Sequence, residues 1–207
     1  MPLNRAGAAA WLAAWAQKAE ANVDYLTDLD RQIGDADHGA NLKRGLAAVT
    51  ALDPDGFAGP ADYLKKTGLT LVSTVGGASG LLYGTFFLRV AAAWPSQEGD
   101  AAGLGAAFKA GLDDIQKRGK AVLGDKTMVD ALVPAFAAYD AATAAGQGIG
   151  PALAQAAAAC AAGRDATVPL IARKGRASYL GERSAGHLDP GAASATYLVE
   201  AAASTLP

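Results

Sequence analysis

Three aspartates, Asp30, Asp35 and Asp37, lie within eight positions of one another and constrain the fold more than any other feature of the sequence. Carboxylates held this close repel one another unless a cation lies between them. Asp35 and Asp37 are two apart, which points both side chains the same way in an extended segment but not on a helix. The chain must therefore fold so that a loop turns three carboxylates toward one point, and a hard metal ion is the simplest explanation.

Other interpretations of the cluster are possible. One aspartate before a helix commonly caps it, and aspartates with glycines are typical of an ordinary turn. A calcium-binding EF-hand is excluded, because counting from Asp35 places Ala40 at the glycine position and Leu46 at the final glutamate position. Mg²⁺ is favoured because it binds through few carboxylates. Three carboxylates around one Mg²⁺ leave one negative charge, whereas two Mg²⁺ leave one positive charge, which attracts a polyphosphate.

The residues around the cluster predict a loop that leads into a helix. Gly34 and Gly39 have more backbone conformations available than other residues, so residues 24–37 are expected to form a loop that can include a short helical turn. A helical pattern then runs from Asn41 to Leu52. A helix amino-terminus favours anions, so a metal beside it indicates a phosphate ligand.

The remainder of the chain indicates an all-helical fold. Alanine is abundant, β-branched residues are sparse and alternating apolar runs are nearly absent. A length of 207 residues suits a single domain over residues 1–207. The expected helices are 6–22, 41–52, 60–75, 81–94, 100–118, one beginning after Thr127, 152–162, about 166–173, and 190–203.

Composition excludes several classes of protein. The 18 basic and 20 acidic residues give a net charge of −2 without a basic stripe, so no nucleic-acid partner is expected. The single Cys160 excludes an internal disulfide and is expected in the core. Residues 6–16 mimic a weak signal peptide, but their helical pattern continues to Glu20. Residues 68–88 are long enough to span a bilayer, but glycines interrupt them. A cytoplasmic protein without a membrane partner is expected.

Two further segments are candidates for ligand binding, one rich in glycine and the other rich in basic residues. Residues 76–80 hold three glycines, which are typical either of a phosphate-cradling loop or of tight helix packing. Residues 173–191 concentrate Arg173, Lys174, Arg176 and Arg183 in a loop broken by glycines, suited to a polyphosphate or a carboxylate partner. Residues 124–130 and 189–190 carry the helix-start signals of a capping box and of an aspartate followed by proline.

The absence of familiar catalytic motifs narrows the chemistry. The Walker A pattern is absent, since Gly119 and Lys120 are followed by Ala121, and neither a nucleophile elbow nor a zinc-protease motif occurs. Aspartates, glycine loops and arginines remain. These residue types suit phosphoryl transfer, which depends on positioning and charge neutralisation more than on covalent catalysis.

Four blocks of the sequence, residues 26–45, 71–88, 118–134 and 172–191, resemble the nucleotide-binding L subunit of bacterial dihydroxyacetone kinases. The resemblance covers nearly the whole chain. One departure is Leu81, which stands where the family is expected to have a proline after Gly80. The resemblance implies a closed barrel of about eight amphipathic antiparallel helices, with nucleotide and two Mg²⁺ at one end.

The resemblance also implies the roles of individual residues. Asp30, Asp35 and Asp37 match the metal ligands of the family, and Arg176 is the expected catalytic residue. The residues that match its ADP or ATP contacts are His38, Gly39, Ala40, Asn41, Ala78, Ser79, Gly119, Met128, Arg176, Asp189, Pro190 and Gly191. By itself Met128 is typical of a core residue, although a methionine can also pad one face of an adenine.

The partners implied by the resemblance are other kinase subunits. A separate K subunit holds dihydroxyacetone covalently on its own histidine. Where a phosphocarrier M subunit of the phosphotransferase system is the donor, ADP stays bound, is rephosphorylated in place and passes its γ-phosphoryl to the sugar. Two alternatives stay open: an ATP-exchanging subunit for dihydroxyacetone or another short ketose, and a non-catalytic regulatory module, because L-type subunits also contact transcription regulators. A homodimer is left open.

Overall fold

The structure, a computed structural model, describes residues 3–96 and 100–206, and within these ranges it contains helices and no strands. The α-helices are α1 (Arg5–Ala21), α2 (Val23–Ile33), α3 (His38–Thr50), α4 (Pro60–Thr74), α5 (Gly77–Ala92), α6 (Ala101–Gly119), α7 (Met128–Ala144), α8 (Ile149–Asp165) and α9 (Pro190–Thr205). Two 3₁₀ segments, η1 (Pro54–Gly56) and η2 (Arg176–Ser184), complete the described elements.

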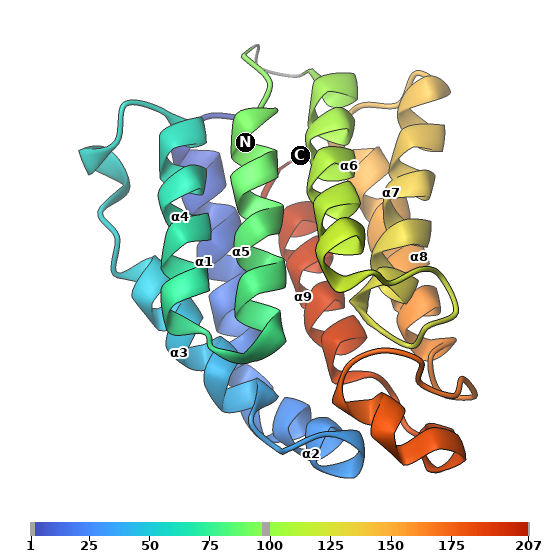
Figure 1. Cartoon of the computed structure of the whole chain (residues 1–207). Coiled ribbons are helices and arrows are strands. Elements are labelled where there is room, and N and C mark those ends of the chain that lie inside the picture. Colours follow the sequence, from blue (N-terminus) through green and yellow to red (C-terminus); the bar gives the residue numbers. More distant parts are fainter. Residues whose placement is uncertain (1–2, 97–99, 207) are drawn as a thin grey trace.

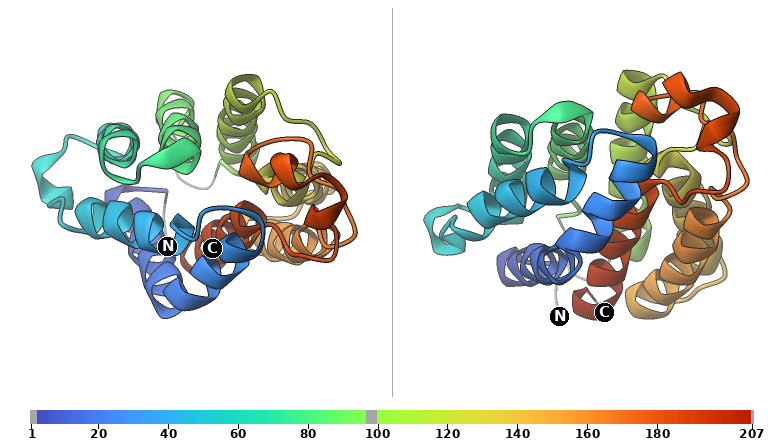
Figure 2. Two further views of the ribbon diagram at one scale, coloured as in Figure 1. Left: turned by 60° about the horizontal axis from the view of Figure 1, so that its bottom comes forward. Right: turned by 90° about the horizontal axis from the view of Figure 1, so that it is seen from below.

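The helices form a closed ring. From α3 to α9 each α-helix packs against the next along the chain, and α1 closes the ring by packing on both α3 and α9 (Figures 1 and 2). Within the described residues this ring contains eight helices, while α2 and η2 lie together across one end, at the bottom of Figure 1. The expected closed helical barrel is confirmed.

Consecutive helices of the ring run in opposite directions. This alternation places the amino-termini of α3, α5, α7 and α9 at one end of the barrel, the end that α2 and η2 partly cover (Figure 1). The loops that connect the remaining helix pairs lie at the opposite end.

Large side chains fill the barrel and hold α1 against α9. Phe108 and Phe136 stack with their ring centroids 5.1 Å apart, and Phe86 stacks on Phe136 at 6.1 Å. Trp11 and Trp15, four residues apart on one face of α1, donate from Nε1 to the carbonyl oxygens of Leu198 and Ser194 on α9, at 2.9 and 3.3 Å. Indole N–H groups that find acceptors in this way satisfy their hydrogen bonding inside an apolar core.

Three sequence-based expectations were wrong. The helix expected from residue 81 begins at Gly77, so residues 77–80 form its first turn. Residues 24–37 form a loop only from Gly34 to Asp37, because α2 occupies Val23–Ile33 and buries Leu26, Leu29 and Ile33 at helical spacing. Residues 166–173 contain turns followed by irregular backbone in place of a helix. Pro169 has no N–H to donate, and Lys126 Nζ takes the carbonyl oxygens of Thr167 and Val168, at 2.7 and 3.4 Å.

Local helix signals were confirmed. Thr127 and Asp130 form the expected capping box of α7, and Asp189 caps α9 with Pro190 as its first residue. The α7 helix begins at Met128 and continues through Pro134. The thiol of Cys160 is fully buried in the core, as expected. None of the helices in the described ranges combines the length and the apolar character that a membrane crossing requires.

Candidate functional site

A pocket of about 190 Å³ lies at the end of the barrel where the four helix amino-termini meet. The first residue of each of these helices lines it: His38 of α3, Gly77 of α5, Met128 of α7 and Pro190 of α9. Each helix start carries a partial positive charge and unpaired backbone N–H groups. In the part of the chain that the structure describes, no side chain caps the α5 start at Gly76, whereas side-chain oxygens accept from backbone N–H groups at the starts of α3, α7 and α9. The pocket is therefore built to attract an anion.

The three aspartates lie on one side of this pocket. One carboxylate oxygen from each of Asp30, Asp35 and Asp37 lies within 4.8 Å of the other two. Asp30 comes from the last turn of α2 and is buried, and its Oδ2 accepts from the backbone N–H groups of Asp37 at 2.8 Å and of His38 at 3.1 Å. These two bonds fold the loop back over the end of α2.

Backbone geometry explains how so short a loop brings the carboxylates together. Gly34 is in direct contact with Asp30, and a Cβ at this position would collide with Asp30 Oδ1. Ala36 adopts a left-handed conformation with φ of 62°, which turns the chain between Asp35 and Asp37. Three oxygen donors with no nitrogen or sulfur ligand fit a hard divalent cation such as Mg²⁺ rather than zinc.

His38 joins the pocket to the interior of the barrel. Its Nε2 lies 2.8 Å from Ser194 Oγ, which lies 2.6 Å from the Tyr83 hydroxyl. Burial lowers the pKa of His38, against the opposing effect of the Asp30 and Asp37 charges. The imidazole is therefore held neutral at physiological pH.

Asp189 is a second perturbed group of the pocket. Its Oδ2 accepts from the backbone N–H of Ala192 at 2.7 Å, which caps α9. Burial raises the pKa of Asp189 to about 7, although this hydrogen bond and the nearby Lys126 charge both favour the carboxylate. A carboxylate with so few partners gains from any cation that enters the pocket.

Arg176 connects η2 to the aspartate loop. Its Nη2 lies 2.8 Å from Asp35 Oδ2, and 69% of its side chain is exposed. Lys174 and Gly175 line the pocket beside it. The guanidinium thus lies against one of the three carboxylates in this structure.

Lys126 lines the pocket and binds the backbone of the segment between α8 and α9. Its side chain is 1% exposed, and its Nζ donates to the carbonyl oxygens of Thr167 and His187 as well as Val168. Burial lowers the pKa of this lysine, while the charges of Asp189 and Asp130 oppose the shift. Sequence reasoning assigned no role to Lys126, because its acceptors are main-chain groups 41 to 61 positions away, which no local pattern reveals.

Most of the predicted site residues line this one pocket: Asp30, Asp35, Asp37, His38, Ala78, Ser79, Met128, Arg176, Asp189, Pro190 and Gly191. Four others lie outside its lining. Gly39 packs closely on Val23 and Thr27 of α2, and Ala40 is exposed. Asn41 Oδ1 accepts from Arg44 at 2.7 Å, and Gly119 ends α6 beside Leu82. The pocket also includes residues that were not predicted: Ile33, Gly34, Gly77, Leu82, Lys126, Thr127, Lys174, Gly175 and Ala177.

Comparison with known proteins gives consistent matches. Residues 32–204 match the family described as the DAK2 domain. The chain is 42% identical over 207 residues to the ADP-binding subunit DhaL of the PEP-dependent dihydroxyacetone kinase of Escherichia coli K12, covering 97% of this chain and 96% of that protein. It is also 42% identical to the ADP-binding subunit DhaL of the PTS-dependent enzyme of Lactococcus lactis, with 92% of both chains covered.

A solved structure shares the fold. The crystal structure of the C. freundii dihydroxyacetone kinase in complex with AMP-PNP and Mg²⁺ superimposes with a TM-score of 0.70 and 23% sequence identity. The match covers 95% of this chain and 33% of the other, so this chain spans about a third of that kinase. The helical barrel is therefore one that also occurs as part of a longer polypeptide.

Proposed function

This chain belongs to the DAK2 domain family, and from that premise we propose that it is the ADP-binding, phosphoryl-transferring subunit of a dihydroxyacetone kinase. The observation that carries the proposal is the meeting of three aspartates and four helix amino-termini in one pocket. One side of such a pocket holds cations and the other attracts phosphates. Residues 1–207 act as one nucleotide-binding domain in this proposal.

Asp30, Asp35 and Asp37 are the residues that would hold Mg²⁺. The buried Asp30 is fixed by two backbone N–H groups, so it anchors the set, while the more exposed Asp35 and Asp37 complete it. Bound Mg²⁺ supplies neutralisation of the phosphate charge. Two ions suit three carboxylates better than one, because only then does the cluster carry a net positive charge toward a polyphosphate.

The nucleotide is proposed to lie across the four helix starts. The open N–H groups at the start of α5, near Ala78 and Ser79, and the first turn of α3, from His38 to Asn41, receive the phosphates. Met128 and Leu82 give the pocket an apolar side for the base. Gly119 and the turn at Asp189, Pro190 and Gly191 complete the proposed contacts. Arg176 moves from Asp35 to the phosphates once the carboxylates bind cations.

The proposed partners are the other kinase subunits. A K subunit presents dihydroxyacetone, and a phosphocarrier M subunit rephosphorylates ADP that stays bound to this chain. The PEP-dependent and PTS-dependent relatives support this donor over free ATP. The assembly is proposed to be cytoplasmic. Contact with a transcription regulator and a homodimeric state are further hypotheses that rest on the sequence resemblance alone.

Calorimetry of ADP binding with and without Mg²⁺ tests the aspartate assignment. In Mg²⁺, Asp35→Asn should weaken ADP binding at least tenfold, about 1.4 kcal/mol, because one of three anionic ligands is lost. Without Mg²⁺ the same variant should bind ADP no more weakly than the wild type, because removing a carboxylate reduces repulsion of the phosphates.

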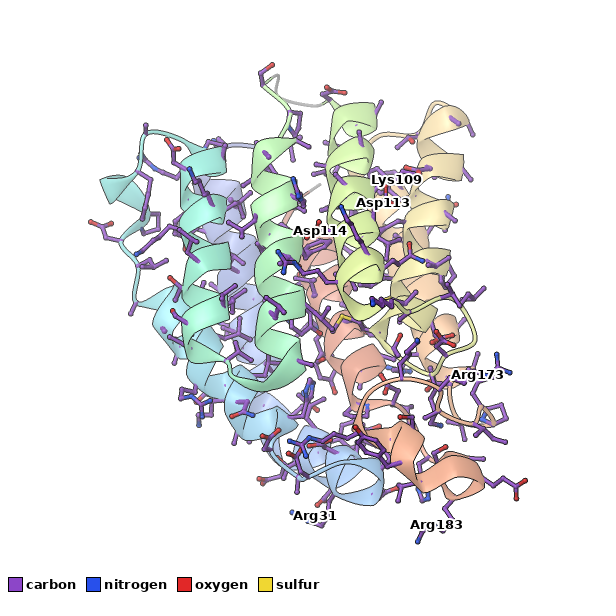
Figure 3. All side chains as sticks on the ribbon, in the orientation of Figure 1. Arg31, Lys109, Asp113, Asp114, Arg173 and Arg183 are labelled. Atoms are coloured by element: carbon purple, nitrogen blue, oxygen red, sulfur yellow. The ribbon has the colours of Figure 1, made fainter. Side chains whose placement is uncertain are left out.

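The matched control is Asp113→Asn, which removes a carboxylate paired with Lys109 on the outer face of α6, away from the pocket (Figure 3). This variant should bind ADP like the wild type under both conditions. ADP affinity that is independent of Mg²⁺, or an equal loss for Asp35→Asn in both buffers, would refute the assignment.

A further inference from the structure

A buried chain of hydroxyl groups ends at the pocket. Tyr83 of α5 and Ser194 of α9 are both 0% exposed, and Ser194 Oγ lies 2.6 Å from the Tyr83 hydroxyl and 2.8 Å from His38 Nε2. The surrounding interior is apolar: Tyr83 packs on Trp15 at 4.9 Å between ring centroids, and alanines flank Ser194 on α9. Phenylalanine and alanine would pack equally well at these two positions without the cost of burying hydroxyls.

Counting protons assigns the direction of each hydrogen bond. Ser194 Oγ has one proton and also lies 3.1 Å from the carbonyl oxygen of Gly191, which can only accept. Without a proton between them these two oxygens would repel, so Ser194 donates to Gly191. The two lone pairs of Ser194 then accept from the Tyr83 hydroxyl and from His38, which places the imidazole proton on Nε2.

The other ring nitrogen of His38 is open to the pocket. Among the described residues no hydrogen bond uses Nδ1, and no buried side-chain nitrogen or oxygen in that part of the chain lacks a partner. Nδ1 is therefore reached by solvent, and the ring lines the pocket. An unprotonated Nδ1 accepts hydrogen bonds and cannot donate to a phosphate oxygen.

We propose that Tyr83 and Ser194 are positioning residues that fix His38 in the tautomer protonated on Nε2, so that Nδ1 accepts from an O–H group of the bound nucleotide or its hydration. The proposal rests on the nucleotide-binding function proposed above. It explains why two hydroxyls are buried at the pocket end of the barrel, where the Tyr83 hydroxyl bonds to Ser194 and Ser194 links it to His38. A tautomer fixed in this way keeps the pocket wall preorganised before the ligand arrives.

The chain has only two histidines, which makes the tautomer directly observable. His187→Gln removes the second imidazole, which contacts Gln32 at the surface, and leaves His38 as the single source of imidazole ¹⁵N signals. Long-range ¹H–¹⁵N spectra should show a protonated Nε2 and an unprotonated Nδ1. Ser194→Ala should give a mixture of tautomers, and Tyr83→Phe a smaller shift in the same direction.

Tyr139→Phe is the matched control, because it removes a core tyrosine hydroxyl whose partner, the Ala101 carbonyl oxygen, lies at the start of α6. It should leave the His38 spectrum unchanged. A wild-type spectrum with the proton on Nδ1, or a Ser194→Ala spectrum identical to the wild type, would overturn the proposal.

Nucleotide binding in Mg²⁺ provides the second readout. Ser194→Ala should weaken ADP about tenfold, the usual scale of one well-made hydrogen bond, while Tyr139→Phe should not. A loss that disappears with 2′-deoxy-ADP or 3′-deoxy-ADP identifies a ribose hydroxyl as the donor, and a loss that persists with both identifies water. A wild-type chain without ADP affinity would refute the proposed function, whereas equal affinity of wild type and Ser194→Ala would refute the positioning role.

Discussion

Among single residues, Arg176 is the one whose structural and functional interpretations differ most. Its guanidinium contacts Asp35 at 2.8 Å but is mostly exposed, and exposed ion pairs contribute only about 0–1 kcal/mol to stability. The pair therefore explains little of the fold. In phosphoryl transfer, by contrast, an arginine at the departing phosphoryl group can contribute factors of about 10³ or more in rate. A contact that costs little to break leaves the arginine free to move between carboxylate and phosphate.

We expect Arg176→Ala to fold normally, to bind ADP more weakly and to lose most transfer activity in the assembled kinase. Arg176→Lys should restore activity only partly, because a point charge replaces a planar fork. Arg183→Ala, at the outer edge of the same segment, is the control and should behave like the wild type (Figure 3). The measurements are the reconstituted transfer rate and a thermal melt of each variant, and near-normal transfer by a folded Arg176→Ala would leave Arg176 as surface charge.

At the scale of elements, the sequence correctly predicted those helix features that depend on residues close together in the chain. The capping box of Thr127 and Asp130 was confirmed because its partners are three residues apart. The helix expected at residues 166–173 was wrong because the competing donor, Lys126, lies 41 positions from Thr167. Helix α2 was not predicted although its apolar residues have helical spacing, because the aspartates led to a loop being expected over all of residues 24–37.

The close packing of α4 on α5 gives a prediction at the same scale. A Cβ on Gly68 would lie 2.7 Å from the carbonyl oxygen of Gly84. This oxygen belongs to the backbone, so relieving the clash requires the two helices to move apart. Gly68→Ala should therefore lower the free energy of unfolding by about 1–3 kcal/mol, although alanine favours a helix by about 1 kcal/mol. ADP should also bind more weakly, because α5 begins at the pocket.

Urea unfolding and ADP calorimetry check this expectation. Gly56→Ala is the control, because a Cβ there meets no atom within 4 Å and the backbone φ is not positive. If Gly68→Ala is as stable as Gly56→Ala, the crossing of the two helices tolerates a methyl group and the packing argument is wrong.

For the whole molecule, the decisive property is that four helix starts meet at one end. The starts of α7 and α9 carry cap signals in the sequence at Thr127 and Asp189, whereas the expected starts of α3 and α5 were three and four residues too late. Their convergence depends on the antiparallel order of the ring and on its closure through α1 and α9, which join residues almost 190 positions apart. Helix periodicity does not specify that closure, so the barrel could be expected only from the family resemblance.

The composition of the assembled pocket decides what the chain can do alone. Three lining groups, Lys126, Lys174 and His38, could in principle attack a ketone. Lys126 Nζ is held by backbone carbonyl oxygens, and the open Nδ1 of His38 is the nitrogen proposed above to accept from the nucleotide or its hydration. Cys160 is fully buried in the core, where burial raises the pKa of its thiol to about 12. Lys174 lies beside Arg176, where the phosphates are proposed to bind. A covalent site for the ketone is therefore not expected on this chain.

We expect the purified chain with ATP, Mg²⁺ and dihydroxyacetone to form no dihydroxyacetone phosphate above the buffer blank. Activity should appear when a K subunit is added and should be lost again with Asp35→Asn, because the nucleotide site on this chain is then impaired. A coupled assay for the phosphorylated product measures all three conditions. Turnover by the chain alone that Asp35→Asn abolishes would contradict the division of labour between two subunits, since it would require both the nucleotide site and the ketone site to lie within this barrel.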